Sequence, residues 1–166
     1  PRLAAQALVE PDADGDDRSS DAFRMLFDYI SGANRGARKV AMTVPVEMVS
    51  DSQKIAMTAP VEKRAEADGK TLMRFFLPAE FTSETAPEPT DPRVSLITVP
   101  GQTVAVFSFA GLGFDSTVKS KKQALMNRLE TTDWRPVGEP FAYFYDPPWT
   151  LPPLRRNEVV VPVARR

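Results

Sequence analysis

The sequence predicts an α+β fold in which two helices accompany a mostly antiparallel sheet that curves or closes into a barrel. Segments with the strand-like alternation of apolar and polar residues are frequent, and two other segments carry apolar residues at the helical period. Strands and helices follow in a similar order in both halves of the chain. We therefore expect one domain over residues 1–166, built from a duplicated unit with halves at about residues 1–78 and 93–166.

The first predicted element is a strand at Pro1–Glu10, followed by an acidic loop at residues 11–18. The loop lacks the glycine and glutamate positions of an EF-hand calcium site, which favours a solvated loop. Residues 19–21, Ser-Ser-Asp, are expected to provide the N-cap of the first helix, which ends at Gly32. The apolar stripe of this helix consists of Phe23, Leu26, Phe27 and Ile30.

A nine-residue motif then occurs twice, at Lys39–Glu47 and Lys54–Glu62. Both copies alternate with period two, which predicts two strands joined by the turn Ser50–Gln53. Each copy contains a proline, so each strand must have an edge, a bulge or a break there. Glu47 and Glu62 occupy equivalent positions, as a catalytic carboxylate pair would, but their place on the polar phase favours solvent exposure. The methionines of the repeats can line a ligand pocket or ligate iron, whereas the pattern alone favours a core role.

A third strand is predicted at Thr71–Leu77, and the Pro/Thr/Glu-rich connector at residues 78–92 marks the midpoint of the chain. Arg93–Val99 and Thr103–Phe109 are then predicted to pair as a hairpin across Pro100-Gly101. The second helix is expected from about Asp115 to Thr132. Its inward residues are Val118, Leu125 and Leu129, and its outward residues are Lys119, Lys121 and Lys122.

Two closing strands are predicted at Phe141–Tyr145 and Glu158–Val163, with a stiff proline-rich loop at residues 146–157 between them. Arg155 and Arg156 in this loop can grip a carboxylate of a ligand, or they can pair with acidic residues and hold the loop in place. The pattern does not decide between these two roles.

The composition excludes several kinds of chemistry. The chain contains no cysteine and no histidine, which removes disulfides, thiolate nucleophiles, Ser–His catalysis and His-bound haem or zinc. A net charge of −1 argues against an electrostatic grip on nucleic acid and favours a solvated face over a phosphate patch for the helix lysines. Gly111-Leu-Gly113 is only half of a dinucleotide-binding motif and predicts a tight turn. No apolar run is long enough to span a bilayer.

Three motifs together resemble the SOUL haem-binding protein family, in the form common in its bacterial members. They are Tyr29-Ile-Ser-Gly32-Ala-Asn34, Met42-Thr43-Val44-Pro45-Val46, and Tyr145-Asp146-Pro147-Pro148 leading to Arg155-Arg156-Asn157-Glu158. Their order and spacing agree with the family over nearly the whole chain, from Leu3 to Val163. The resemblance implies a pseudo-twofold distorted β-barrel of two β-α-β-β-like repeats with two helices outside, related to the effector-binding, gyrase-inhibitor-like fold.

In this family a tetrapyrrole is thought to lie in a shallow hydrophobic groove between the first helix and the loop before the last strand. Carried over to this chain, the resemblance implies ligand-binding roles for Phe23, Leu26, Phe27, Met42, Tyr145, Trp149, Leu151, Arg155 and Arg156. No catalytic or metal-ligating residue is implied. Without histidine, only Met, Tyr and Lys side chains remain as iron ligands, and we expect no strong axial ligand. Among these side chains Tyr145 is the first candidate for a bond to iron.

The resulting functional prediction is a non-enzymatic carrier of haem or a related tetrapyrrole, bound non-covalently. The alternatives are an effector-binding or protein-interaction module for another hydrophobic ligand, and a hydrolase or lyase that uses Glu and Tyr. We expect a small hydrophobic partner, no nucleic acid and no membrane span, with a monomer favoured. Because the chain starts at Pro1, we expect that it was trimmed, which leaves the compartment open between the cytoplasm and the periplasm or exterior.

Overall fold

The computed structural model describes residues 1–11, 18–36, 52–57, 60–66, 68–146 and 149–166. Its main feature is one antiparallel sheet in the order β6-β1-β4-β3-β9-β10-β7, and β8 pairs with the C-terminal end of β10 outside this order. The strands are β1 (Arg2–Val9), β3 (Val61–Ala65), β4 (Thr71–Phe76), β6 (Val94–Val99), β7 (Val104–Ala110), β8 (Trp134–Pro136), β9 (Phe141–Phe144) and β10 (Arg156–Arg165). The short strands β2 (Asn34–Arg35) and β5 (Glu88–Pro89) pair separately. The helices are α1 (Ser19–Ser31), α2 (Asp115–Leu129) and the 3₁₀ helix η1 (Pro152–Leu154).

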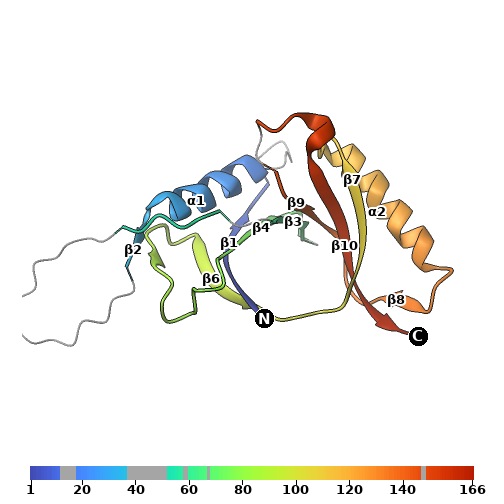
Figure 1. The fold of residues 1–166 in the computed structure, drawn as a ribbon, viewed down its shortest axis with the longest axis horizontal. Helices are drawn as coiled ribbons and strands as arrows, with labels where there is room; N and C mark the ends of the chain where they lie inside the picture. The colour runs from blue at the N-terminus through green and yellow to red at the C-terminus, as the bar shows by residue number, and fades with distance from the viewer. Residues whose placement is uncertain (12–17, 37–51, 58–59, 67, 147–148) are drawn as a thin grey trace, which may run out of the picture.

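The sheet is strongly curved but remains open. β6 and β7 form its two edges, although only residues 100–103 separate them in the chain, and Figure 1 shows the curve that this short link requires. The predicted α+β class is confirmed, whereas no barrel closes among the described strands. The predicted hairpin of Arg93–Val99 with Thr103–Phe109 is wrong, because β6 pairs with β1 and β7 pairs with β10. A Pro-Gly turn favours a hairpin only through local geometry. Pairing with β1 and with β10 gives β6 and β7 full ladders of backbone hydrogen bonds, and these stabilise the observed pairing more than the turn stabilises a hairpin.

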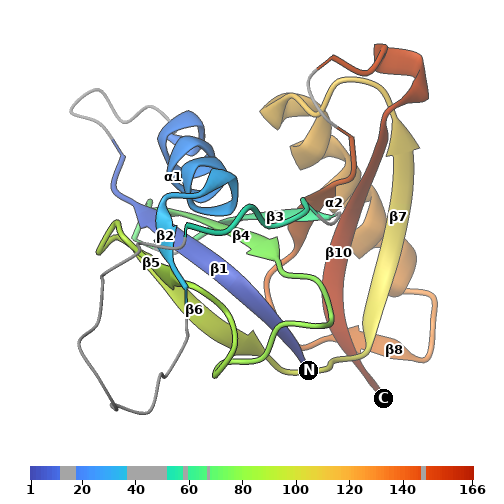
Figure 2. The ribbon, with the colours of Figure 1, turned by 60° about the vertical axis from the view of Figure 1, so that its left-hand side comes forward.

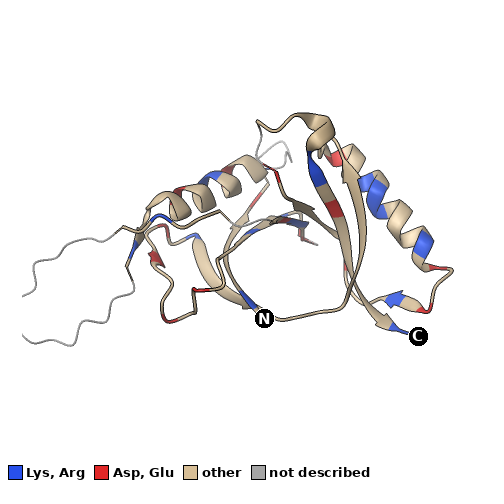
Figure 3. Ribbon diagram, viewed as in Figure 1, with Lys and Arg blue, Asp and Glu red and all other residues tan. Residues whose placement is uncertain are grey.

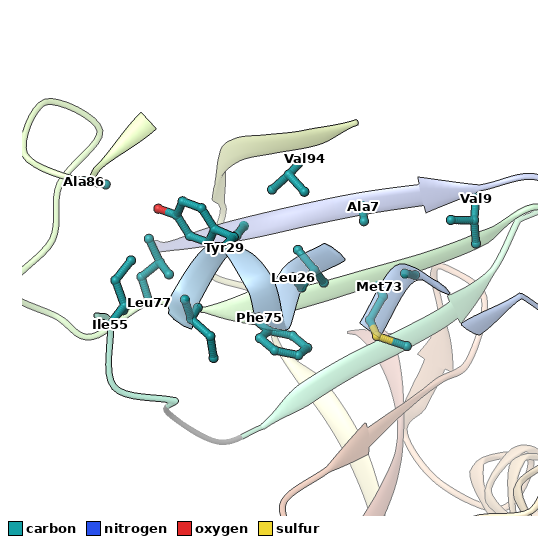
Figure 4. Close-up of a cluster of buried hydrophobic side chains, with 13 residues drawn as sticks. Ala7, Val9, Leu26, Tyr29, Ile55, Met73, Phe75, Leu77, Ala86 and Val94 are labelled. Carbon is teal, nitrogen blue, oxygen red and sulfur yellow. The ribbon is translucent and has the colours of Figure 1, made fainter. Parts of the chain in front are cut away.

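Both helices lie on the outer, convex face of the sheet (Figures 1 and 2). α1 packs on β1, β4 and β6, and α2 packs on β7, β8 and β10. Alternation along the strands then divides the side chains between the two faces. Ala7, Met73 and Phe75 point toward α1 (Figure 4), and together with Ala5 they form a buried cluster with it. Their neighbours along the strands point to the opposite side, which we call the inner face.

α1 confirms the predicted helix but not its predicted cap. The helix begins at Ser19, and the N-cap residue is Arg18, which makes no side-chain cap bond; the Arg18 Nε instead donates to Asp21 at 2.7 Å. Gly32 ends the helix with φ at 125°, a conformation that favours glycine. The side chains buried against the sheet are Ala22, Leu26, Tyr29 and Ile30. Phe23 is half-buried and Phe27 is 43% exposed, so these two residues of the predicted stripe lie at the edge of the helix face that packs on the sheet.

The repeated motif gives a different local structure from the one expected. The first copy, Lys39–Glu47, lies outside the described residues. In the second copy, residues 54–57 form no strand, and β3 begins only at Val61. Pro60 directly precedes the strand, a position where its missing N–H costs no ladder bond. Before it, Ile55 is buried beside α1, and its N–H donates to the Ile30 carbonyl at 2.8 Å.

In the second half, β9 and β10 confirm the predicted closing strands. α2 ends at Leu129, three residues before the predicted Thr132, whose hydroxyl donates to the Leu129 carbonyl at 2.9 Å. The inward positions are confirmed, since Val118, Leu125 and Leu129 are buried. Lys119 is exposed as expected, whereas Lys121 and Lys122 are half-buried. No helix in the described part of the chain has the length and apolar character needed to cross a membrane.

Candidate functional site

A groove of about 350 Å³ lies beside α2, above β3, β4 and β9 on the outer face. We call it the interhelical groove, because Figure 1 shows β3 and β9 between the two helices. Its lining residues are Pro11, Lys63, Ala65, Gly69, Thr71, Asp115, Val118, Lys119, Lys122, Ala142 and Phe144. The volume lies in the range of small-molecule sites, and the lining combines an apolar floor with charged side chains.

Glycines shape the end of this groove where Phe144 lies. A Cβ atom on Gly113 would be only 2.3 Å from Cε1 of Phe144, so any larger residue would displace this ring. Gly111 has φ at 107°, which allows the turn between β7 and α2. The Asn157 side chain donates to the Gly111 carbonyl at 2.8 Å and fixes that turn. The glycine pair therefore forms the predicted tight turn and leaves room for the Phe144 ring at the groove.

Two phenylalanines of α1 lie on the same outer face. The Phe23 and Phe27 rings stack with centroids 6.1 Å apart, and Phe23 meets Phe75 of β4 edge-on at 5.3 Å. Phe75 is paired in register with Val61, and Val61 with Phe144. Directly opposed residues on adjacent strands lie about 5 Å apart. An apolar row therefore runs across the sheet from the α1 stack to the Phe144 floor of the interhelical groove.

The charges at the groove are mostly positive. Three lysines and one aspartate line it, and the Lys63 ammonium pairs with Asp115 at 3.1 Å. Figure 3 shows basic residues along α2. Burial lowers the pKa of Lys122 below its ordinary value, and the positive charges of Lys63 and Arg64 lower it further. The groove therefore combines an apolar floor with a surplus of ammonium groups.

The structure brings Tyr145 and Arg156 together, but on the inner face. The Tyr145 hydroxyl donates to Glu158 at 2.6 Å, and the Arg156 guanidinium lies 4.5 Å from the centre of the Tyr145 ring and also donates to Glu158. Glu158 is the cross-strand partner of Tyr143, two residues from Val160, on the side away from the helices. Phe23 and Phe27 thus lie on the opposite face of the sheet from Tyr145.

The remaining predicted site residues have separate places. Trp149 and Leu151 are 82% and 66% exposed in the loop before β10, where η1 contacts β7. Arg155 Nε donates to the Thr150 carbonyl at 2.7 Å, and the backbone N–H of Arg156 donates to Asp146 at 2.6 Å, so the Arg155 side chain and the Arg156 backbone help to hold the loop in place. Leu26 has no exposed surface and belongs to the core under α1 (Figure 4). Met42 lies outside the described residues.

Comparison with known proteins decides the family. The family model described as SOUL heme-binding protein matches residues 1–162, nearly the whole chain. The chain belongs to this family. No curated protein matches it at a significant level.

Two crystal structures of proteins from Listeria innocua share the fold of this SOUL domain. One is described as a hydrolase, with 14% identity and a TM-score of 0.60, covering 98% of this chain and 87% of that one. The other is an uncharacterized conserved protein, also with 14% identity and a TM-score of 0.62, covering 98% and 88% of the two chains. At this identity the likeness concerns the fold alone.

Haem, the ligand that the family description names, has an apolar ring and carboxylate substituents, and the described residues of this SOUL domain offer an apolar surface beside ammonium groups. No group of three or more His, Cys, Asp or Glu side chains is arranged for a metal within the described residues. Burial raises the pKa of Tyr145, the hydrogen bond and charge of Glu158 raise it further, and its hydroxyl is already committed to that carboxylate. A phenolate bond to iron would therefore have to break this pair. The half-exposed Phe27 ring and the ammonium groups of the groove suit an apolar ring with anionic substituents.

Sequence reasoning missed a polar row on the inner face. Gln6, Arg74, Glu62, Tyr143, Glu158 and Ser108 are successive cross-strand partners from β1 to β7. Arg74 donates to Gln6 at 2.8 Å and to Glu62 at 3.0 Å. The expectation that Glu62 is exposed is wrong, since its side chain is only 1% exposed; Glu47 lies outside the described residues. Alternation shows which side chains share a face, but only the curvature of the sheet encloses that face.

Proposed function

We propose that this protein binds haem or a related tetrapyrrole non-covalently on the outer face between α1 and α2, as a carrier rather than an enzyme. The observation that carries the proposal is the half-exposed Phe23–Phe27 stack, joined by an apolar row to the interhelical groove. Flat aromatic ligands are held well by stacked or edge-on rings. Membership of the SOUL family supports the same class of ligand.

The expected affinity is moderate. Burying about 400 Å² of a flat ring contributes roughly 10 kcal/mol at about 25 cal/mol per Å². Association costs at least about 4 kcal/mol, which leaves at most about 6 kcal/mol, or a dissociation constant no lower than tens of micromolar. Apolar contact therefore suffices for weak, exchangeable binding, and no axial bond is needed.

Within this proposal Phe23 and Phe27 form the wall on α1. Trp149 and Leu151 belong to the proposed ligand-binding set as exposed apolar side chains of the loop before β10. Exposed apolar side chains that form a contiguous patch mark an interaction site. They equally suit the alternative function, an interaction module in which the loop contacts a protein partner.

Equilibrium titration with haem, protoporphyrin IX and biliverdin tests the proposal. We expect saturable binding with dissociation constants below about 100 μM and a haem spectrum without a strong sixth ligand. Trp149→Ala should weaken binding severalfold if the loop contributes, with Val137→Ala, an exposed apolar side chain next to β8, as the control. Absence of saturable binding for all three ligands would remove the tetrapyrrole carrier and leave the interaction module.

A hydrolase function has one specific observation in its favour, the pairing of Tyr145 with Glu158. Burial alone would raise the pKa of Glu158, but hydrogen bonds from Tyr145 and Arg156 overcome this and hold it below its ordinary value. The pKa of Tyr145 is raised. General acid–base catalysis needs groups with a pKa near the working pH, and both shifts lead away from it. The pair therefore supports a structural role better than a catalytic one.

A further inference from the structure

Lys122 differs from the other lysines of α2 in its surroundings. It lines the interhelical groove together with Val118 and Phe144 and is half-buried, whereas Lys119, which also lines the groove, is exposed. Within the described part of the chain its ammonium makes no hydrogen bond and no ion pair. Lys63, by contrast, pairs with Asp115, and Lys121 lies with its ammonium 5.5 Å from the centre of the Phe107 ring.

The surrounding charges favour an anion at this place. Lys63 and Arg64 repel the Lys122 ammonium, while Asp115 and Glu139 attract it. Asp115 is already paired with Lys63, and its side chain is 74% exposed. A half-buried ammonium without a direct partner gains most from a ligand that brings its own negative charge, because desolvated charge-assisted bonds are the strong ones.

We propose that Lys122 binds the carboxylate of an amphipathic ligand whose apolar body lies on Val118 and Phe144. This rests on the proposed function, since it assigns a place to the acidic side chains of a tetrapyrrole. It also goes beyond it, because any carboxylate on an apolar body meets the same two requirements. Lys122 is then the residue that distinguishes the acid from an uncharged ligand of equal shape.

The decisive comparison uses protoporphyrin IX and its dimethyl ester, followed by fluorescence titration of the unmodified protein. The two probes share the ring and differ in the carboxylates, so we expect about tenfold tighter binding of the acid. Lys122→Met should remove this preference by weakening the acid about tenfold while leaving the ester unchanged. Lys122→Arg should retain most of it. Lys121→Met is the matched control, because it removes the same charge from the adjacent position outside the groove lining.

A fluorescent long-chain fatty acid separates this inference from the tetrapyrrole proposal. If neither porphyrin binds but the fatty acid does, with about tenfold loss in Lys122→Met, the carboxylate site stands and the tetrapyrrole function fails. If acid and ester bind equally, or if Lys121→Met and Lys122→Met weaken the acid alike, the tetrapyrrole function stands and the Lys122 contact is refuted. If neither the porphyrins nor the fatty acid bind, both are refuted.

Discussion

Substitution of Leu26 and Phe27, neighbours on α1, separates a packing role from a ligand-binding role. Leu26 has no exposed surface, whereas Phe27 is 43% exposed and stacks on Phe23. Leu26→Ala leaves a cavity between the helix and the sheet and should lower the free energy of unfolding by about 3 kcal/mol. Phe27→Ala loses only the buried part of its ring and gains helix propensity, so it should cost about 1 kcal/mol.

The ligand should reverse this order. Loss of the Phe27 stack removes about 1 kcal/mol of aromatic contact, which weakens protoporphyrin binding about fivefold. Leu26→Ala, measured in conditions where the variant is folded, should bind with nearly unchanged affinity. Urea unfolding and fluorescence titration of both variants supply the two measurements. Equal, large destabilisation by both substitutions, with unchanged affinity for both, would show that the ligand does not use this helix and would refute the reasoning.

Two further predictions concern the inner face. Glu62→Gln removes the charge that compensates Arg64 and Arg74, so it should lower the free energy of unfolding in urea by about 3 kcal/mol. The control Glu84→Gln, at an exposed position, should change the free energy of unfolding by less than about 0.5 kcal/mol. Similar values for both variants would contradict a structural role for the buried charge. The folded-state pKa of Glu158 lies below its ordinary value of 4.5, so the stability that it contributes is present above that pH and is lost as the pH falls through the lower folded-state pKa. A Glu158→Gln variant should lack this part of the acid dependence in thermal unfolding measured from pH 6 to pH 3, and an unchanged profile would exclude the linkage.

The local elements were predictable because their signals are local. β1, β4, β9, β10 and both helices follow from periodicity, from Gly32 and from the turn residues around them. The pairing of β6 with β1 was not predictable, because it depends on partners about 90 residues apart in the chain. The division of the chain into two duplicated halves stays a prediction.

The candidate site was predictable only in part, for a similar reason. The stripe of α1 predicted the positions of Phe23 and Phe27, but no local pattern indicates that Phe144 lies in the same apolar row. That row depends on the register of β3 with both β4 and β9. The alternation around Tyr145 and Arg156 likewise could not assign them to the inner face, because this requires the curvature of the whole sheet.

The position of β1 within the sheet has a consequence for how the chain folds. This first strand lies between β4 and β6, whose residues come about 70 and 90 positions later. During synthesis the N-terminal strand therefore has no ladder partner until β4 has been made, and its second edge stays unpaired until β6 follows. Such non-local pairing is slow, and an unpaired apolar strand is exposed to aggregation in the meantime. Because α1 follows β1 in the chain and packs on it, contact with this helix can cover the apolar face of β1 before β4 and β6 are made. The buried face of α1 then contributes to folding as well as to the stability of the folded protein.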